Sequence, residues 1–278
     1  MCEISKIRKK YSAKLPRLDW EILLATSIKK DRTFLYTNPQ YKLRWQEFLR
    51  FKHFLCKYKR GFSVAAIIGQ KEFYNLNFYV NKHTLIPRPD TELMVQETIA
   101  LINNASSTTL IDVGTGSGCI PISVIKNIKK TIPAIAIDIS PAALRMAKKN
   151  AQTHQTEIDF RCGNLLTPIK KSDVRTNTLV VTANLPYLTF AQTTKEKSIK
   201  KEPHLALYGG KDGLDIYHQL LDQIIGFDGK SQRNYLLLEI DPAQTTKIQD
   251  TIIQKIPTTK IKIRQDLAGL DRLVIVEF

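Results

Sequence analysis

The pattern of apolar and polar positions first predicts helices. From about residue 16 to residue 60, apolar residues recur three to four positions apart between charged ones, as in LDWEILLATSI and YKLRWQEFLRFKHFLCKY. The dipeptide Asn38-Pro39 interrupts these two stretches. We therefore expect a small helical domain over residues 1–70.

The pattern then changes to runs of aromatic and β-branched residues. The segment KEFYNLNFYVNKHTL has such residues on both sides of Asn75 to Asn77, where Asn favours a turn. This arrangement predicts a β-hairpin, and we assign residues 71–86 as a bridge between two domains.

Residues 87–278 alternate short apolar runs with stretches that are mostly long enough for a helix. The runs are TLIDV, AIAID, EIDFR, TLVVTA, NYLLLEI, KIKIRQ and DRLVIVEF. Alternation of this kind predicts an α/β fold with a doubly wound, mostly parallel sheet. A short loop joins the last two runs, so we expect these two strands to pair antiparallel.

A glycine-rich turn follows the first of these strands, in the segment TLIDVGTGSG. Glycines make such a turn tight and let a ligand approach the backbone, and the N-terminus of the next helix offers free N–H groups. The spacing is GxGxG, which also occurs in turns that bind nothing, so a purely structural turn stays open. The candidate cofactor-binding residues are Gly114, Thr115, Gly116, Ser117 and Gly118.

The next strand ends in Asp138, 24 residues beyond Gly114. An acidic side chain at this place can bond both hydroxyls of an adenosine ribose, which favours a nucleotide-type ligand. The alternative is that Asp138 only caps the helix that starts near Ser140. After the third strand, Asn164 and Leu165 lie where an adenine ring would be expected.

The fourth strand ends in the sequence Asn184-Leu185-Pro186-Tyr187. The side-chain oxygen of Asn184 and the backbone carbonyl of Leu185 can accept the two N–H groups of a planar NH₂ group. Pro186 restricts the loop, and Tyr187 offers an aromatic face for stacking. These features suit a methyltransferase that acts on such a group, although a turn with a buried Tyr remains the alternative.

With these motifs, the chain resembles the release factor glutamine methyltransferases over almost its whole length. The most diagnostic segment is Ile86 to Glu92, IPRPDTE, which general methyltransferases of this fold lack. The other matching segments are PRLDWEILL, GQKEFYNLNFYV, IDVGTGSGCI, AIDISPAALRMAKKNA, EPHLALYGGKDGL, LLLEI and DLAGLDR.

The resemblance implies a class I methyltransferase (Rossmann-like) domain with a seven-stranded sheet whose last strand is antiparallel. It implies an enzyme, a protein-(glutamine-N5) methyltransferase. This enzyme would transfer the methyl group of S-adenosyl-L-methionine to the glutamine amide of the Gly-Gly-Gln motif in peptide-chain release factors. The cofactor would contact Gly114 to Gly118, Asp138, Asn164, Leu165 and Asn184. Residues 184 to 187 and Arg88 would bind the glutamine, and no metal is required. The helical domain over residues 1–70 would dock the protein substrate.

The chain departs from the family pattern at one important position. The family has Asn-Pro-Pro-Tyr, whereas here Leu185 replaces the first proline. The sequence Asn-Leu-Pro-Tyr is the form seen in methyltransferases that act on adenine in ribosomal RNA, so this substrate is one alternative. Another is a methyltransferase-like binding protein without activity, which the intact Gly114, Asp138, Asn184 and Tyr187 oppose.

Charge adds a second indication about partners. The net charge is +16, and residues 1–80 hold 17 Lys or Arg against 6 Asp or Glu. Such a field attracts acidic proteins and gives incidental affinity for nucleic acid. A lysine-rich solvated surface is the alternative, and it also applies to the cluster Lys195, Lys197, Lys200 and Lys201, which otherwise would face an incoming macromolecule.

Composition narrows the cellular setting. No apolar run is long enough to span a bilayer, and the basic start leads into Asp19 and Glu21, so we expect a cytoplasmic protein without membrane contact. The four cysteines are scattered, without a Cys-x-x-Cys pair or a nearby His, which predicts neither a disulfide nor a zinc site. We also expect a monomer.

Overall fold

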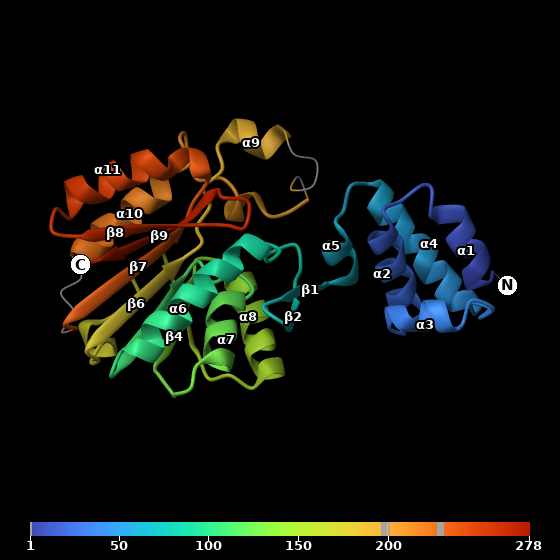
Figure 1. The fold of residues 1–278 in the computed structure, drawn as a ribbon, viewed down its shortest axis with the longest axis horizontal. Helices are drawn as coiled ribbons and strands as arrows, with labels where there is room; N and C mark the ends of the chain where they lie inside the picture. The colour runs from blue at the N-terminus through green and yellow to red at the C-terminus, as the bar shows by residue number, and fades with distance from the viewer. Residues whose placement is uncertain (1, 196–198, 200, 227–230) are drawn as a thin grey trace. The chain divides into compact units, whose positions relative to one another are not determined.

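A computed structural model describes residues 2–195, 199, 201–226 and 231–278. The chain divides into two compact units, residues 1–70 and residues 71–278 (Figure 1). Each unit has its own hydrophobic core, and the two are described separately below. Within the described residues, no helix has the length and apolar character needed to cross a membrane.

The N-terminal unit is helical, as its apolar periodicity predicts. Its helices surround a core that includes Trp20, Leu24 and Phe51. The third helix ends just before Asn38-Pro39, where the sequence indicates a break. The helices are α1 (Ile4–Tyr11), α2 (Arg17–Ile28), α3 (Arg32–Thr37), α4 (Trp45–Lys59) and α5 (Val64–Ile68).

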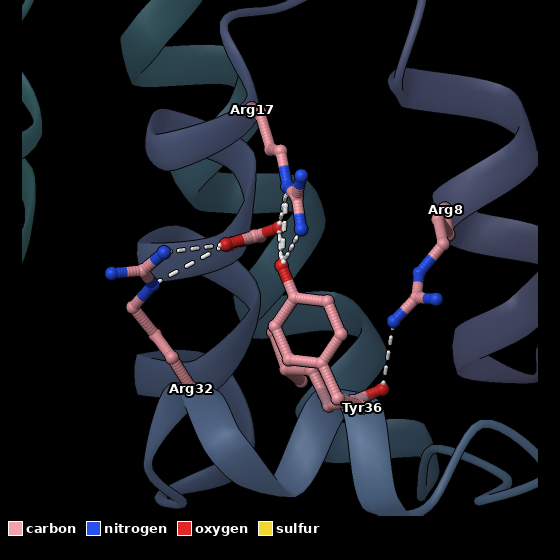
Figure 2. A network of polar contacts seen from close by, with 6 residues as sticks. Arg8, Arg17, Arg32 and Tyr36 are labelled. Atoms are coloured by element: carbon pink, nitrogen blue, oxygen red, sulfur yellow. Dashed lines mark hydrogen bonds and ion pairs between the residues drawn. The ribbon is translucent and has the colours of Figure 1, made fainter.

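A buried carboxylate, Glu21 on α2, is held within this unit by three donors. Arg17 Nε lies 2.9 Å from one carboxylate oxygen and Arg32 Nη2 lies 2.8 Å from the other. The Tyr36 hydroxyl donates to the same oxygen as Arg17. Figure 2 shows the two guanidinium groups approaching from different helices, α2 and α3, with the Tyr36 ring between Arg17 and Arg8. The network therefore ties α2 to α3.

The second unit contains the seven-stranded sheet that the sequence predicts. Its strand order is β5-β4-β3-β6-β7-β9-β8, in which only β9 runs antiparallel to its neighbours. The predicted fold class and the antiparallel pairing of the last two strands are confirmed. The strands are β3 (Thr108–Val113), β4 (Ala134–Asp138), β5 (Asp159–Cys162), β6 (Thr178–Ala183), β7 (Arg233–Glu239), β8 (Lys260–Gln265) and β9 (Asp271–Glu277).

Helices cover both faces of this sheet (Figure 1). One face packs against α10 and α11, and the other packs against α6, α7 and α8, so the sheet separates two apolar layers. Strands β3 and β6 are buried along their whole length between the layers. The helices are α6 (Glu92–Asn104), α7 (Cys119–Asn127), α8 (Pro141–His154), α9 (Phe190–Lys195), α10 (Asp215–Ile225) and α11 (Thr245–Lys255), with short 3₁₀ helices η1 (Pro89–Thr91), η2 (Lys171–Asp173), η3 (His204–Ala206) and η4 (Pro242–Gln244).

A two-stranded sheet of β1 (Gln70–Phe73) and β2 (Leu76–Tyr79) precedes η1. Its turn lies at Tyr74 and Asn75, both with positive φ, one position earlier than the sequence indicates. Two positive φ values in a row give the turn whose twist matches the strands of a hairpin. The strands end at Tyr79, and the chain has no regular element from there to η1.

Candidate active site

The parallel strands bring their carboxyl ends to one edge of the sheet, where ligands bind in folds of this class. The glycine turn follows β3 at this edge, and α7 begins directly after it at Cys119. Gly114 has φ +73°, and an added Cβ there would come within 2.8 Å of Leu185 Cδ2. The glycine turn, residues 114–118 (the cofactor loop), is therefore in direct contact with residues 184–187 (the catalytic loop), and the positive φ favours glycine at position 114.

Asp138 joins the glycine turn to the start of α8. One carboxylate oxygen accepts the N–H of Gly116 and the other accepts the N–H of Ser140, both at 2.8 Å. Burial raises the pKa of Asp138, and these two hydrogen bonds oppose the rise. The helix itself is capped by the Ser140 hydroxyl, which accepts from Ala143 N. Asp138 thus does more than cap the helix, because it also fixes the glycine turn.

A cavity of about 660 Å³ opens at this edge and brings together most of the residues that the sequence singles out. Their segments come from the ends of four strands and from the IPRPDTE segment. Gly118 and Tyr187 are the two predicted residues that do not line it. Those that do are Arg88, Gly114, Thr115, Gly116, Ser117, Asp138, Asn164, Leu165, Asn184, Leu185 and Pro186.

A second cavity of about 380 Å³ lies next to the first and contains Tyr187 in its wall. Arg88, Asn184 and Leu185 border both cavities, so these side chains stand between the two spaces. Asp241 and Arg272 line the second cavity only. The site therefore has two compartments that meet at the catalytic loop.

The side-chain amide of Asn184 is oriented by Thr91. Asn184 Nδ2 donates to Thr91 Oγ1 at 3.0 Å, which leaves the Asn184 side-chain oxygen to accept other donors. The Leu185 carbonyl faces the buried Tyr217 hydroxyl at 3.3 Å, and that hydroxyl also bonds the Glu239 carbonyl. A carbonyl oxygen has two lone pairs, so the Leu185 carbonyl retains the capacity for a second donor.

The loop of residues 209–213 supports the catalytic loop from behind. A Cβ at Gly213, where φ is +79°, would lie 2.1 Å from the Tyr187 carbonyl oxygen. Gln244 Nε2 donates to that same oxygen at 2.9 Å. The Gly-Gly-Lys-Asp-Gly stretch thus lets two backbones approach closely, and it does not line either cavity.

Arg88 is held by an ion pair with Glu202 at 2.5 Å, and Glu202 also accepts the N–H of Ile86 at 3.1 Å. Thr91 immediately precedes α6 but makes no side-chain cap hydrogen bond there. The segment instead positions Thr91 and Arg88 at the site. Of the lysines after the catalytic loop, Lys197 and Lys200 lie outside the described residues.

Sequence reasoning missed two residues of this site, Thr91 and Glu239. Glu239 is the last residue of β7 and is 3% exposed. Burial raises its pKa to about 7, and the nearby Asp90 carboxylate adds to the rise. Hydrogen bonding from Thr91 and Tyr187 and the charge of Arg272 oppose it. The available signal was the run LLLEI, in which an acidic residue ends a fully apolar strand.

Asp112, next to the last residue of β3, is another buried carboxyl near the site. It accepts from Thr182 Oγ1 at 2.7 Å, and burial raises its pKa to about 7. All four cysteines are free thiols. Within the described residues, no three His, Cys, Asp or Glu side chains gather in a way that could hold a metal ion.

Two family models match the chain, each over one of the two units. Residues 6–69 match a PrmC N-terminal domain, and residues 104–201 match a methyltransferase domain. The second match includes the glycine turn, Asp138 and the catalytic loop. The main loops that line the 660 Å³ cavity therefore lie within the part of the chain that matches a methyltransferase domain.

Similar proteins match nearly the whole chain. A release factor glutamine methyltransferase of Koribacter versatilis is 32% identical over 94% of this chain and 90% of its own length. One from Enterococcus faecalis is 34% identical over 89% of this chain and 87% of its own length. Among solved structures, a methyltransferase from Pyrococcus furiosus superposes with a TM-score of 0.53 at 15% identity, covering 82% of this chain and 96% of that one. This last likeness concerns the fold alone.

Proposed function

Because the chain belongs to the family of release factor glutamine methyltransferases, we propose that it methylates a glutamine side-chain amide in a peptide-chain release factor. The methyl donor is S-adenosyl-L-methionine, and the acceptor is the amide nitrogen of the glutamine in the Gly-Gly-Gln motif. The observation that carries the proposal is the position of Asn184 and Leu185, which border both cavities.

The larger cavity fits the methyl donor. Its volume is within the range of small-ligand sites, and the glycine turn presents backbone rather than side chains to it. Asp138 offers free lone pairs to ribose hydroxyls, and Asn164 and Leu165 line the wall beyond it. When bound, S-adenosyl-L-methionine supplies a methyl group on a sulfonium, a good leaving group that removes the need for a strong base.

The smaller cavity suits the glutamine. Tyr187 lies in its wall, and Asn184 is reached from it on one side and from the larger cavity on the other. The Asn184 oxygen and the Leu185 carbonyl would each accept one N–H of the target amide. These two acceptors orient the nitrogen and offset the positive charge that grows on it during transfer. The proton that the nitrogen loses can pass to water.

The N-terminal unit would dock the release factor. On α4, Trp45 is 69% exposed and Leu49, one turn later, is 47% exposed. Exposed apolar residues within a basic surface are typical of protein interaction sites. This docking function and the monomeric state remain predictions. The protein substrate and the four free thiols support a cytosolic location.

The two alternative functions are not favoured. Leu185 is the feature that suggests ribosomal RNA adenine, but the relatives that match 94% and 89% of this chain are release factor glutamine methyltransferases. A binding protein without activity would not need the two-compartment site. Leu185 instead packs onto Gly114, so its side chain has a place in this fold.

The test is transfer of labelled methyl from S-adenosyl-L-methionine to a purified release factor. The same factor with its Gly-Gly-Gln glutamine replaced by alanine is the matched control, and ribosomal RNA is a third acceptor. Label on the intact factor alone would support the proposal. Label on the RNA alone would identify Leu185 as a mark of a different substrate, and label on none of them would leave no support for activity.

A further inference from the structure

A line of polar side chains leads from the catalytic loop into the protein interior. Asn184 Nδ2 donates to Thr91 Oγ1 at 3.0 Å, and the Thr91 hydroxyl faces the buried carboxyl of Glu239. These residues come from the ends of β6, η1 and β7. The register of the two strands, Ala183 opposite Leu238, brings Asn184 and Glu239 side by side.

The acceptor to which the Thr91 hydroxyl donates its proton decides the direction of the hydrogen bonds along this line. Thr91 Oγ1 accepts from Asn184, so its single proton is available to an acceptor, and within the described residues the Glu239 carboxyl faces it. Glu239 has the matching need, because its Oε1 accepts from Tyr187 at 3.4 Å while its buried Oε2 has no partner there. A buried oxygen without a donor is costly, so the Thr91 proton belongs on Glu239.

We propose that Glu239 is a positioning residue for methyl transfer, which acts through Thr91 to hold the Asn184 side-chain oxygen toward the acceptor amide. As a carboxylate, Glu239 can only accept, so Thr91 must donate to it and can only accept from Asn184. The NH₂ group of Asn184 is thereby committed to Thr91. This inference rests on the proposed function, in which that oxygen accepts an N–H of the target glutamine.

Protonation of Glu239 would reverse the direction of the hydrogen bonds along this line. A neutral Glu239 can donate to Thr91, and Thr91 can then donate to the Asn184 oxygen. The amide of Asn184 would rotate and present its NH₂ group to the NH₂ group of the substrate. Two donors cannot bond each other, so the acceptor nitrogen would lose its hold.

The groups around Glu239 come from several elements. Burial is the main cause that raises the pKa of Glu239, and Asp90 on η1 adds to the rise. Hydrogen bonds from Thr91 and Tyr187 and the charge of Arg272 on β9 lower it, and the result is a pKa of about 7. Tyr217 on α10 and Cys119 on α7 also face it, and the charge of Glu239 raises the pKa of both. The change of orientation therefore falls near neutral pH.

The decisive experiment measures the single-turnover rate of methyl transfer to a release factor as a function of pH. The wild-type rate should fall about tenfold per pH unit below pH 7, as one ionisable group requires. Glu239→Gln should lose this fall in rate at low pH (the acidic limb of the pH–rate profile), because the glutamine amide cannot change its charge. An acidic limb that persists in Glu239→Gln with the same midpoint would overturn the proposal.

A pair of variants at Thr91 tests the line without removing the carboxyl. Thr91→Ser keeps the hydroxyl and should keep both the rate and the acidic limb. Thr91→Val has nearly the same shape without the hydroxyl, and its rate should fall about 100-fold at all pH values because the acceptor is misplaced. Equal rates in these two variants would overturn the proposal, and this pair decides the matter if Glu239→Gln does not fold.

Two controls separate other causes. Asp112 also has a pKa of about 7, so an acidic limb that vanishes in Asp112→Asn and survives in Glu239→Gln would assign the limb to Asp112. Affinity for S-adenosyl-L-methionine should be unchanged in both Thr91 variants. Failure of the wild-type protein to label the Gly-Gly-Gln glutamine would refute the proposed function itself, whereas labelling without these differences would refute only the positioning of Asn184.

Discussion

Glu21 in the N-terminal unit and Glu239 beside the catalytic loop are both almost unexposed to solvent, at 1% and 3%, although Glu239 lies deeper in its core, and their pKa values move in opposite directions. Burial raises the pKa of Glu21, but hydrogen bonds from Tyr36, Arg32 and Arg17 outweigh it and hold the pKa below the ordinary value. The pKa of Glu239 rises to about 7. Burial alone therefore does not set the charge of a carboxyl.

Besides the deeper burial of Glu239, the difference lies in the donors that the fold supplies. Each oxygen of Glu21 receives a charged donor, so the hydrogen-bonding needs of its ionised form are met (Figure 2). The carboxylate thereby joins α2 to α3. Glu239 receives only uncharged donors, the Thr91 hydroxyl and the Tyr187 hydroxyl at 3.4 Å, and the nearby cation Arg272 is bound to Asp266 at 2.9 Å. A buried carboxyl without a charged donor can change its charge near neutral pH, which is typical of functional sites.

The largest effect is expected at Asn184, the residue to which Glu239 is linked through Thr91. Asn184→Ala should lower the rate of methyl transfer about 10²–10³-fold, the usual cost of losing one preorganised hydrogen-bonding group. The melting temperature should change little. Asn103→Ala, an exposed asparagine on α6, is the matched control, and transfer by Asn184→Ala at the rate of that control would contradict the assignment.

The next largest effect is expected at Glu21, whose two carboxylate oxygens both receive charged donors. Glu21→Ala should lower the free energy of unfolding of the N-terminal unit by about 1.5–3 kcal/mol, because charged hydrogen bonds are lost in the interior. Tryptophan fluorescence during urea unfolding reports this unit alone, since both tryptophans, Trp20 and Trp45, lie in it. An unchanged midpoint beside the exposed control Glu157→Ala would mean that the network is not structural.

The pH dependence of stability should separate the two glutamates by sign. A raised pKa means that the folded state prefers the neutral carboxyl, so Glu239 costs stability as pH rises from its unfolded pKa to about 7, and above that pH the cost levels off. The free energy of unfolding of Glu239→Gln, relative to that of wild type, should therefore be roughly 2 kcal/mol higher at pH 8 than at pH 5. Urea unfolding followed by circular dichroism measures this difference.

Glu21 should behave in the opposite way, because its pKa is lowered in the folded state. Its contribution is present above the unfolded pKa and is lost as pH falls through the folded one. Glu21→Gln should accordingly be most destabilised near neutral pH and approach wild type in acid. The same pH trend in both glutamine variants would remove the contrast between these residues.

The smallest effect is expected from Arg272, the cation that moderates Glu239. Arg272→Gln removes a charge that lowers the pKa of Glu239, so the acidic limb of the transfer rate should move to higher pH. Its slope should not change. A midpoint that stays in place, with Arg264→Gln on β8 as the control, would show that Arg272 does not act on Glu239.

Several parts of the molecule follow from the sequence. The seven apolar runs became the seven strands, because alternation of short apolar runs with helical stretches leaves few other folds. The helical N-terminal unit followed from its periodicity, although α1 and α5 were not anticipated. Eleven of the thirteen candidate site residues line the larger cavity, since the motifs lie at strand ends and parallel strands end at one edge.

The sequence alone determined the local elements, the glycine turn and the Asn-Leu-Pro-Tyr loop, because periodicity and turn chemistry act between residues that are close in the chain. Only the tertiary structure decided that β9 lies between β7 and β8, and that Thr91, Asn184 and Glu239 meet. These contacts join residues far apart in sequence, and their positions depend on strand order and register. The number of donors that reach a buried carboxyl, and hence its pKa, is fixed by that packing rather than by its neighbours in the chain.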